Sequence, residues 1–308
     1  MPFYTMQDDE KLYVREIGQG EPVLVLSGLG MQSWQWIPFF AFNLKKYKFI
    51  IPDWRGFGGS KHCKIPDTDA ISSHWNDIQA LISQRPRQQY RVIAYSMGAT
   101  TAMHGMQYGQ FADQIQAYLH IDQTSKIPSD ETWSFGLLGD RYPEFKKLLI
   151  ELSSFLHQHE NYQNLSELPT HLSRELVELW VKFLSLQDNH QLSAKIFKTT
   201  LNQPKIQKLI LPMQRLDYMR WYIDNYLKHK EDYRAAISKL ECPATFFIGA
   251  KSALYPAQGQ KLIAESVKNH RIVLFERSGH TPLINEPIKF AQEISKFLNQ
   301  TILALMNI

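Results

Sequence analysis

The chain has 308 residues, of which 44% are hydrophobic and 21% are charged, and its formal net charge is +4. This composition is typical of a globular protein and excludes extensive disorder, and the Lys and Arg residues are too scattered to support a nucleic-acid partner. The two cysteines, Cys63 and Cys242, lie far apart in no metal-ligand spacing, which argues against a disulfide framework and against a zinc site.

The N-terminal segment predicts no export signal. Residues 1–14 carry charges where a signal peptide would need an apolar run. No stretch of the chain reaches the roughly 18 apolar residues that a membrane span needs. Together with the two cysteines, which we expect to be reduced thiols, these features suit a cytoplasmic protein.

Strands and helices alternate through the first 121 residues. Short apolar runs predict strands at 11–17, 22–26, 48–51, 90–94 and 115–121, and helical spacing predicts helices at 36–46, 71–84 and 97–108. The run at 22–26 is apolar throughout, as expected of a strand that is buried on both faces of a parallel sheet. The alternation predicts a doubly wound α/β sheet.

The pattern changes between residues 125 and 240, where no convincing strand is found. The stretches 144–157, 173–186 and 216–228 repeat apolar residues at helical spacing. Strands resume at 244–248 and 271–275, and an amphipathic helix is expected at 286–298. We therefore predict a core domain built from residues 1–124 and 241–308, with residues 125–240 inserted as a helical cap, or lid.

The apolar C-terminal segment at 297–308 is too short to span a membrane. We expect it to form a last helix that packs on the core. The alternative is an interfacial helix or the contact surface of a homodimer.

The segment Ala94-Tyr95-Ser96-Met97-Gly98 lies between a predicted strand and a predicted helix. In this context a G-x-S-x-G pattern indicates a nucleophile elbow, a turn so tight that its flanking residues must be small. Gly98 meets this requirement, and Ala94 departs from the usual first glycine by a single methyl group. The helix N-terminus favours the negative charge that develops when Ser96 attacks a carbonyl group. The other interpretation is a chance turn of small residues.

Three further motifs follow predicted strands. They are Ser27-Gly28-Leu29-Gly30 after the strand at 22–26, the loop DWRGFGGS at 53–60, and Ser278-Gly279-His280 after the strand at 271–275. Together with the elbow, they resemble the α/β-hydrolase fold superfamily, in its serine esterase and lipase-like branch with a helical cap. The resemblance covers the whole chain except the insertion. It implies a mostly parallel, eight-stranded sheet flanked by helices, with Ser96 as nucleophile and His280 as general base.

The orienting acid departs from the common pattern of this family. The acid usually follows the strand at 244–248 as G-x-x-D, but this chain reads Gly249-Ala250-Lys251-Ser252. A serine cannot stabilise an imidazolium by charge. Asp122 follows the strand at 115–121, and some branches of the family, including a set of haloalkane dehalogenases, carry their acid there. We predict that Asp122 completes a catalytic triad; the alternative is a structural aspartate that caps the next turn.

The same resemblance implies an oxyanion hole formed by the backbone N–H groups of Leu29 and Met97. The expected substrate pocket includes Gly28, Trp34, Tyr95 and Trp221. The predicted insertion is rich in aromatic residues, which favours an apolar pocket and predicts a medium-sized apolar ester, thioester or lactone as substrate. Water would release the acyl group, and no metal or organic cofactor is implied.

Three alternatives stay open. The same machinery serves lactonases, including those that act on acyl-homoserine lactones, and carbon–carbon bond hydrolases. A cofactor-independent dioxygenase of the quinolone type shares a histidine base and an acid after the same strand as Asp122, and would depend little on Ser96. A non-catalytic ligand-binding protein that kept the fold is supported only by Ser252 at the usual position of the acid.

Overall fold

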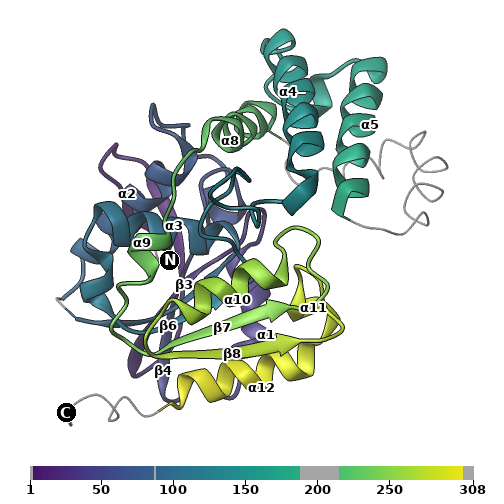
Figure 1. The fold of residues 1–308 in the computed structure, drawn as a ribbon. Coiled ribbons are helices and arrows are strands. Elements are labelled where there is room, and N and C mark those ends of the chain that lie inside the picture. The colour runs from purple at the N-terminus through teal and green to yellow at the C-terminus, as the bar shows by residue number, and fades with distance from the viewer. Residues whose placement is uncertain (1–2, 87, 188–214, 301–308) are drawn as a thin grey trace.

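The computed structural model describes residues 3–86, 88–187 and 215–300 (Figure 1). Its eight strands form one sheet in the order β1-β2-β4-β3-β5-β6-β7-β8. The strands are β1 (Phe3–Thr5), β2 (Lys11–Gly18), β3 (Glu21–Leu26), β4 (Tyr47–Pro52), β5 (Tyr90–Tyr95), β6 (Ile115–Ile121), β7 (Ala244–Gly249) and β8 (His270–Phe275). Neighbours from β4 to β8 pair in parallel, whereas β2 pairs antiparallel with both β1 and β4. The predicted α/β sheet of eight mostly parallel strands is confirmed.

Helices cover both faces of the sheet. Helices α1 (Ile37–Phe40) and α12 (Pro287–Leu298) pack on one face, and α2 (Ala70–Ser83), α3 (Met97–Tyr108) and α10 (Ala257–Glu265) on the other (Figure 1). Alternate residues of a strand point to opposite faces. Val25 therefore packs in the cluster that contains Phe290 of α12, and Leu24 in the cluster that contains Met103 of α3. Burial on both faces explains why the central strands are continuous apolar runs.

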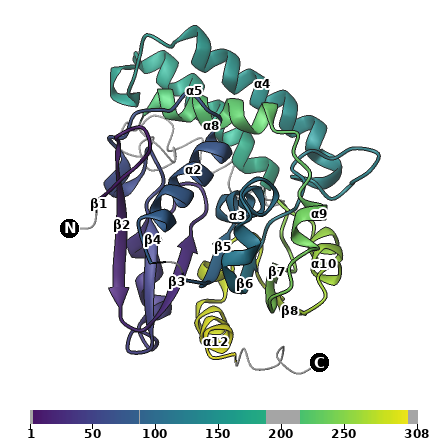
Figure 2. The same ribbon diagram turned by 90° about the vertical axis from the view of Figure 1, so that its left-hand side faces the viewer.

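The described residues between β6 and β7 are helical, with isolated bridges but no extended strand. The helices are α4 (Tyr142–Gln158), α5 (Thr170–Gln187), α8 (Leu216–Lys228) and α9 (Arg234–Ile237). Helices α4, α5 and α8 form a layer beyond the edge at which β3 ends (Figure 2). Helix α8 is joined to the rest by hydrogen bonds from Tyr218 to the Cys63 carbonyl and from Tyr222 to the Arg55 carbonyl. This layer therefore lies on the side of the sheet where the predicted catalytic residues occur.

The helix predicted at 36–46 is wrong in its extent. A 3-10 turn at Ser33–Trp36 leads into α1, which ends at Phe40. The chain must then reverse into β4, and it does so through turns in which the Asn43 N–H donates to the Phe40 carbonyl and the Lys46 N–H to the Asn43 carbonyl. The apolar spacing that suggested a longer helix arises instead because several side chains, such as Trp36 and Phe40, pack under the sheet.

Both ends of the chain add to the sequence-based picture. Strand β1 was not located from the sequence, because three half-exposed residues give no alternation to read. At the other end, Phe297 and Leu298 are buried at the end of α12. Residues 301–308 lie outside the described residues, so the predicted C-terminal helix and the homodimer stay predictions.

None of the described helices combines the length and the apolar character that crossing a membrane requires.

Candidate active site

Ser96 stands at the junction of β5 and α3 in a strained backbone conformation. Its φ of 51° and ψ of −122° lie outside the regions that side chains normally allow. The conformation is held from both sides, because the Ser96 N–H donates to the Ile121 carbonyl and the Ser96 carbonyl accepts from the Ala99 N–H at 2.8 Å. Such strain is retained when the surrounding structure fixes it, and at a nucleophile it projects the side chain out of the turn.

Small residues allow the elbow to approach the strand beside it. A Cβ atom added at Gly98 would lie 2.2 Å from the carbonyl oxygen of Leu26 at the end of β3. A Cβ atom at Gly28 would lie 3.1 Å from the ring of Tyr95 and 3.3 Å from Cβ of Ser96. The loop after β3 therefore packs directly on the nucleophile turn.

His280 lies in hydrogen-bonding contact with Ser96. Its Nε2 atom is 3.0 Å from Ser96 Oγ, and its Nδ1 atom is 2.7 Å from Asp122 Oδ2. With the Nδ1 proton directed at the carboxylate, Nε2 is left to accept the serine proton. Tyr95 fixes the position of His280 through two contacts. Its hydroxyl donates to the His280 carbonyl at 2.9 Å, and its ring stacks on the imidazole with 5.4 Å between the ring centroids.

The Asp122 carboxylate is fully buried and accepts four hydrogen bonds. Oδ1 accepts from the backbone N–H of Gly249 at 3.0 Å and from the side-chain amide of Gln260 at 2.9 Å. Oδ2 accepts from the hydroxyl of Ser252 at 2.7 Å as well as from His280. A buried carboxylate is costly unless donors of this kind compensate its lost hydration. Ser252 therefore does not stand in for the acid and instead donates to it.

The sheet register explains why a carboxylate after β6 can reach the histidine. Tyr95 of β5 pairs with Ile121 of β6, which in turn pairs with Phe247 of β7. Parallel strands that pair in this register end side by side, so the residues that follow β5, β6 and β7 meet at one edge. Asp122 therefore lies between the nucleophile turn and the loop after β7.

The two backbone N–H groups predicted to form the oxyanion hole lie in the turn after Ser96 and in the loop after β3. Neither the Met97 N–H nor the Leu29 N–H donates to another described residue. The loop that carries Leu29 is fixed by two indoles, because Trp36 donates to the Ser27 hydroxyl at 3.0 Å and Trp54 to the Ser27 carbonyl at 2.8 Å. Such preorganised, unpaired donors are what an oxyanion hole requires.

The four residues expected in the substrate pocket separate into two pairs. Gly28 and Tyr95 lie against Ser96 and His280, as described above. Trp34 is 55% exposed and its indole N–H donates to Gln32, while the Trp221 indole N–H donates to the Thr68 carbonyl. Among the described residues, no hydrogen bond or ring contact joins either tryptophan to the Ser96, Asp122 and His280 cluster. The place of Trp34 and Trp221 in the substrate pocket stays a prediction.

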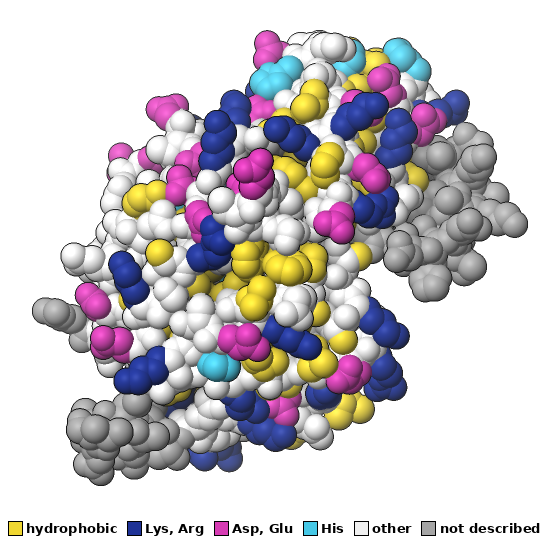
Figure 3. All heavy atoms as spheres, in the orientation of Figure 1, with side chains coloured by type: hydrophobic (Ala, Val, Ile, Leu, Met, Phe, Trp, Pro, Cys, Tyr) yellow, Lys and Arg dark blue, Asp and Glu magenta, His cyan; other side chains and the backbone are white. Residues whose placement is uncertain are grey.

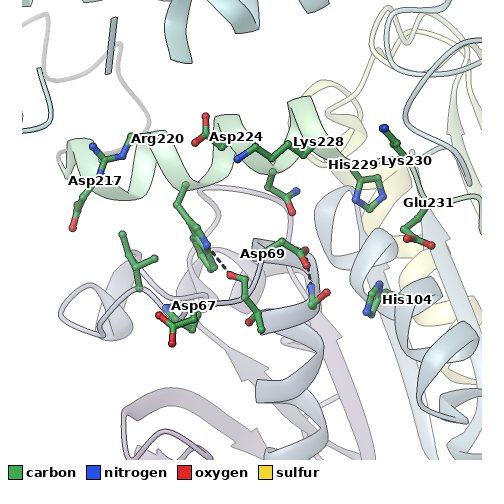
Figure 4. A pocket seen from close by; sticks show the side chains of 16 residues that line it. Asp67, Asp69, His104, Asp217, Arg220, Asp224, Lys228, His229, Lys230 and Glu231 are labelled. Carbon is green, nitrogen blue, oxygen red and sulfur yellow. Dashed lines mark hydrogen bonds between the residues drawn. The ribbon is translucent and has the colours of Figure 1, made fainter. Parts of the chain in front are cut away.

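Trp221 instead lines a separate cleft of about 620 Å³ between α8 and the segment at 65–72 (Figure 4). Ionisable side chains of both signs surround it, including Asp69, Arg220 and Lys228. Burial lowers the pKa of His229, which also lines the cleft, to about 4. Within the described ranges, no group of three or more His, Cys, Asp and Glu side chains could hold a metal ion.

Sequence reasoning missed Gln260 and Tyr255, which lie beside Asp122 and His280. Gln260 of α10 donates to Asp122, and the Tyr255 ring lies edge-on to the His280 ring at 5.3 Å. No local pattern marks either residue, because each reaches the site only through the packing of the β7–α10 segment against the ends of β6 and β8.

Comparison with known proteins identifies the family to which the chain belongs. The sequence profile of the alpha/beta hydrolase fold matches residues 21–287. The pimeloyl-[acyl-carrier protein] methyl ester esterase of Legionella pneumophila (strain Corby) is 22% identical over 287 residues, which cover 93% of this chain and 99% of that protein. An esterase from Exiguobacterium antarcticum has a similar structure, with a TM-score of 0.70 at 18% identity over 97% of this chain and 99% of that one. The enol-lactonase from Burkholderia xenovorans LB400 gives a TM-score of 0.67 at 17% identity over 97% and 100%. The chain therefore belongs to the family of alpha/beta hydrolase fold enzymes, as its motifs predicted.

Proposed function

We propose that the protein is a serine hydrolase that cleaves carboxylic esters through an acyl-enzyme. The observation that carries the proposal is the continuous chain of contacts from Ser96 Oγ to His280 Nε2 at 3.0 Å and from His280 Nδ1 to Asp122 Oδ2 at 2.7 Å. A serine hydroxyl becomes a useful nucleophile when a neighbouring base takes its proton and a third group orients that base. The esterase names of relatives at 21–22% identity support ester cleavage as the reaction.

In the first half of the reaction, Ser96 Oγ attacks the ester carbonyl carbon while His280 Nε2 takes the hydroxyl proton. The charge that moves to the carbonyl oxygen is stabilised by the N–H groups of Leu29 and Met97. Asp122 stays ionised and stabilises the imidazolium through its hydrogen bond to Nδ1. His280 then returns the proton to the leaving oxygen as the carbon–oxygen bond breaks, which releases the alcohol and leaves the acyl group on Ser96.

In the second half, a water molecule replaces the alcohol. His280 takes a proton from the water, the hydroxide attacks the acyl carbon, and the same two N–H groups hold the oxyanion. Collapse of this intermediate breaks the bond to Ser96 Oγ, which regains its proton from His280. The products are a carboxylic acid and the free enzyme, and no cofactor takes part.

A medium-sized, apolar acyl group is the substrate class we propose. On the face in Figure 3, charges of both signs are interspersed and apolar side chains gather between the region of α4 and α5 and that of α10. The relative from Legionella pneumophila is named for a methyl ester of a pimeloyl group carried by a protein. These observations favour a small alkyl ester of a medium-length acyl chain over a sugar or a phosphate ester.

Labelling with a fluorophosphonate probe tests the mechanism. We expect the wild-type protein to be labelled and to hydrolyse p-nitrophenyl esters, with longer acyl chains preferred to acetate, and Ser96→Ala to lose both properties. Ser96→Ala that keeps oxygen uptake with a quinolone substrate would instead support the dioxygenase alternative. A wild-type protein that is neither labelled nor active would contradict the proposal and favour a ligand-binding role.

A further inference from the structure

Tyr255 lies in the loop between β7 and α10, against the imidazole of His280. Its side chain is 2% exposed, and the two ring centroids are 5.3 Å apart at an interplanar angle of 65°. Its backbone is tied to the acid, because its N–H donates to Ser252 Oγ and its carbonyl accepts from Gln260 at 2.8 Å. Ser252 and Gln260 both donate to Asp122 as well. The position of Tyr255 is therefore fixed relative to the triad.

The phenol hydroxyl of Tyr255 lies near the side chains of Gln123 and Ser96. Burial raises the pKa of Tyr255 well above its ordinary value, and Gln123 and Ser96 lie close enough to oppose that rise. Gln123 is also engaged with the Thr100 hydroxyl and the Thr124 N–H. The hydroxyl oxygen is not among the fully buried side-chain atoms that lack a hydrogen-bond partner. It is a protonated donor beside the nucleophile, available to an oxygen of the substrate.

The order of the strands shows which oxygen this would be. Leu29 follows β3, on one side of the nucleophile strand β5, whereas Tyr255 and His280 follow β7 and β8 on the other side. An ester that is placed for attack turns its carbonyl oxygen toward the N–H groups of Leu29 and Met97. Its leaving oxygen faces His280, which must protonate it. Tyr255 is on the side of the leaving oxygen.

We propose that Tyr255 is a further catalytic residue, whose O–H donates a hydrogen bond to the leaving oxygen of the ester. The inference rests on the proposed function. When the tetrahedral intermediate collapses, the electron pair of the breaking carbon–oxygen bond goes to the leaving oxygen and the proton comes from His280 Nε2. Tyr255 keeps its own proton and stabilises the developing negative charge. A methyl alkoxide is strongly basic and needs this donor, whereas p-nitrophenolate is weakly basic and leaves without it.

The substitution Tyr255→Phe removes the hydroxyl and keeps the ring against His280. We would compare kcat/KM, which reports the steps up to the acyl-enzyme, for methyl, phenyl and p-nitrophenyl butyrate, three esters with the same acyl group. The expected loss is about tenfold to a hundredfold for the methyl ester, the range for a lost hydrogen bond to a charged group. The loss should be smallest for the p-nitrophenyl ester, so kcat/KM becomes more dependent on the leaving group.

Tyr95→Phe is the matched control, because it also removes a phenol hydroxyl beside His280, one that donates to the backbone carbonyl. We expect Tyr95→Phe to lower kcat/KM by the same factor for all three esters, because this change acts only through the position of the imidazole. If Tyr255→Phe leaves kcat/KM unchanged, or lowers it by the same factor for all three esters, the inference is overturned while the proposed function stands. If the wild-type protein hydrolyses none of the esters and is not labelled at Ser96, the proposed function itself fails.

Discussion

The hydroxyl of Ser252 lies 2.7 Å from Oδ2 of Asp122, the same carboxylate oxygen that contacts His280. Ser252 occupies the loop position at which the family resemblance led us to look for the acid, and Asp122 comes from the end of the neighbouring strand β6. The site therefore contains a carboxylate next to the histidine, and the usual acid position supplies one of its donors. This arrangement removes the only sequence feature that supported a non-catalytic protein.

Asp122→Asn should lower kcat by about three to four orders of magnitude, as the corresponding change does in serine proteases. An amide cannot stabilise the imidazolium by charge, and its N–H₂ group favours the wrong tautomer of His280. Ester hydrolysis measures the loss, and circular dichroism checks that the fold is retained. A well-folded variant within tenfold of the wild-type kcat would show that Asp122 is not the acid of the triad.

A carboxylate at position 252 should partly replace the one at 122. Ser252 Oγ and His280 Nδ1 contact the same oxygen of Asp122, so a side chain at 252 lies within reach of the histidine. We expect Asp122→Asn/Ser252→Asp to recover at least about tenfold in kcat over Asp122→Asn, which corresponds to about 1.4 kcal/mol. Asp122→Asn/Ser252→Asn is the control, with a similar shape and no charge. Equal activity of the two double variants would refute the expectation.

Gly98→Ala should destabilise the protein by about 1–3 kcal/mol or more, because the added Cβ would lie 2.2 Å from the Leu26 carbonyl oxygen. Backbone atoms of β3 would have to move, and the elbow with them. Gly279→Ala is the control, since its Cβ would lie 3.4 Å from the nearest atom, the Lys251 carbonyl oxygen. Urea unfolding of both variants measures the difference. A similar decrease in the free energy of unfolding for Gly98→Ala and Gly279→Ala would mean that the close approach of the elbow to β3 is not what requires glycine at position 98.

Buried His120 should make the protein less stable as the pH falls below neutrality. Burial lowers its pKa to about 4, whereas an unfolded chain binds the proton near its ordinary value of about 6.5. Between these values the unfolded state binds more protons, so the free energy of unfolding decreases as pH is lowered, by about 2 kcal/mol between pH 7 and 4.5. Because the side chain of His120→Gln stays neutral, the free energy of unfolding of this variant should decrease by about 2 kcal/mol less over the same pH range. Urea unfolding at the two pH values measures this difference. An equal decrease in the free energy of unfolding for the wild-type protein and for His120→Gln would contradict the assignment.

Many elements could be predicted because their signals are local. Helix α3 (Met97–Tyr108), strand β6 (Ile115–Ile121) and helix α8 (Leu216–Lys228) have the predicted bounds, since apolar periodicity and flanking turn residues are properties of a few neighbouring positions. The helix at 36–46 was overestimated, because apolar side chains that pack under the sheet have a similar spacing whether the backbone is helical or turning.

The sequence by itself determined the sheet, the serine turn and the histidine loop, because each is set by residues that are close in the chain. Only the tertiary structure decided how the carboxylate is held, since Asp122 meets His280 across 158 positions and Ser252 across 130. It also brought Gln260 to Asp122 and Tyr255 to His280. The physical reason is that strand order and register place distant loops at one sheet edge, and no local pattern of residues encodes which loops will meet.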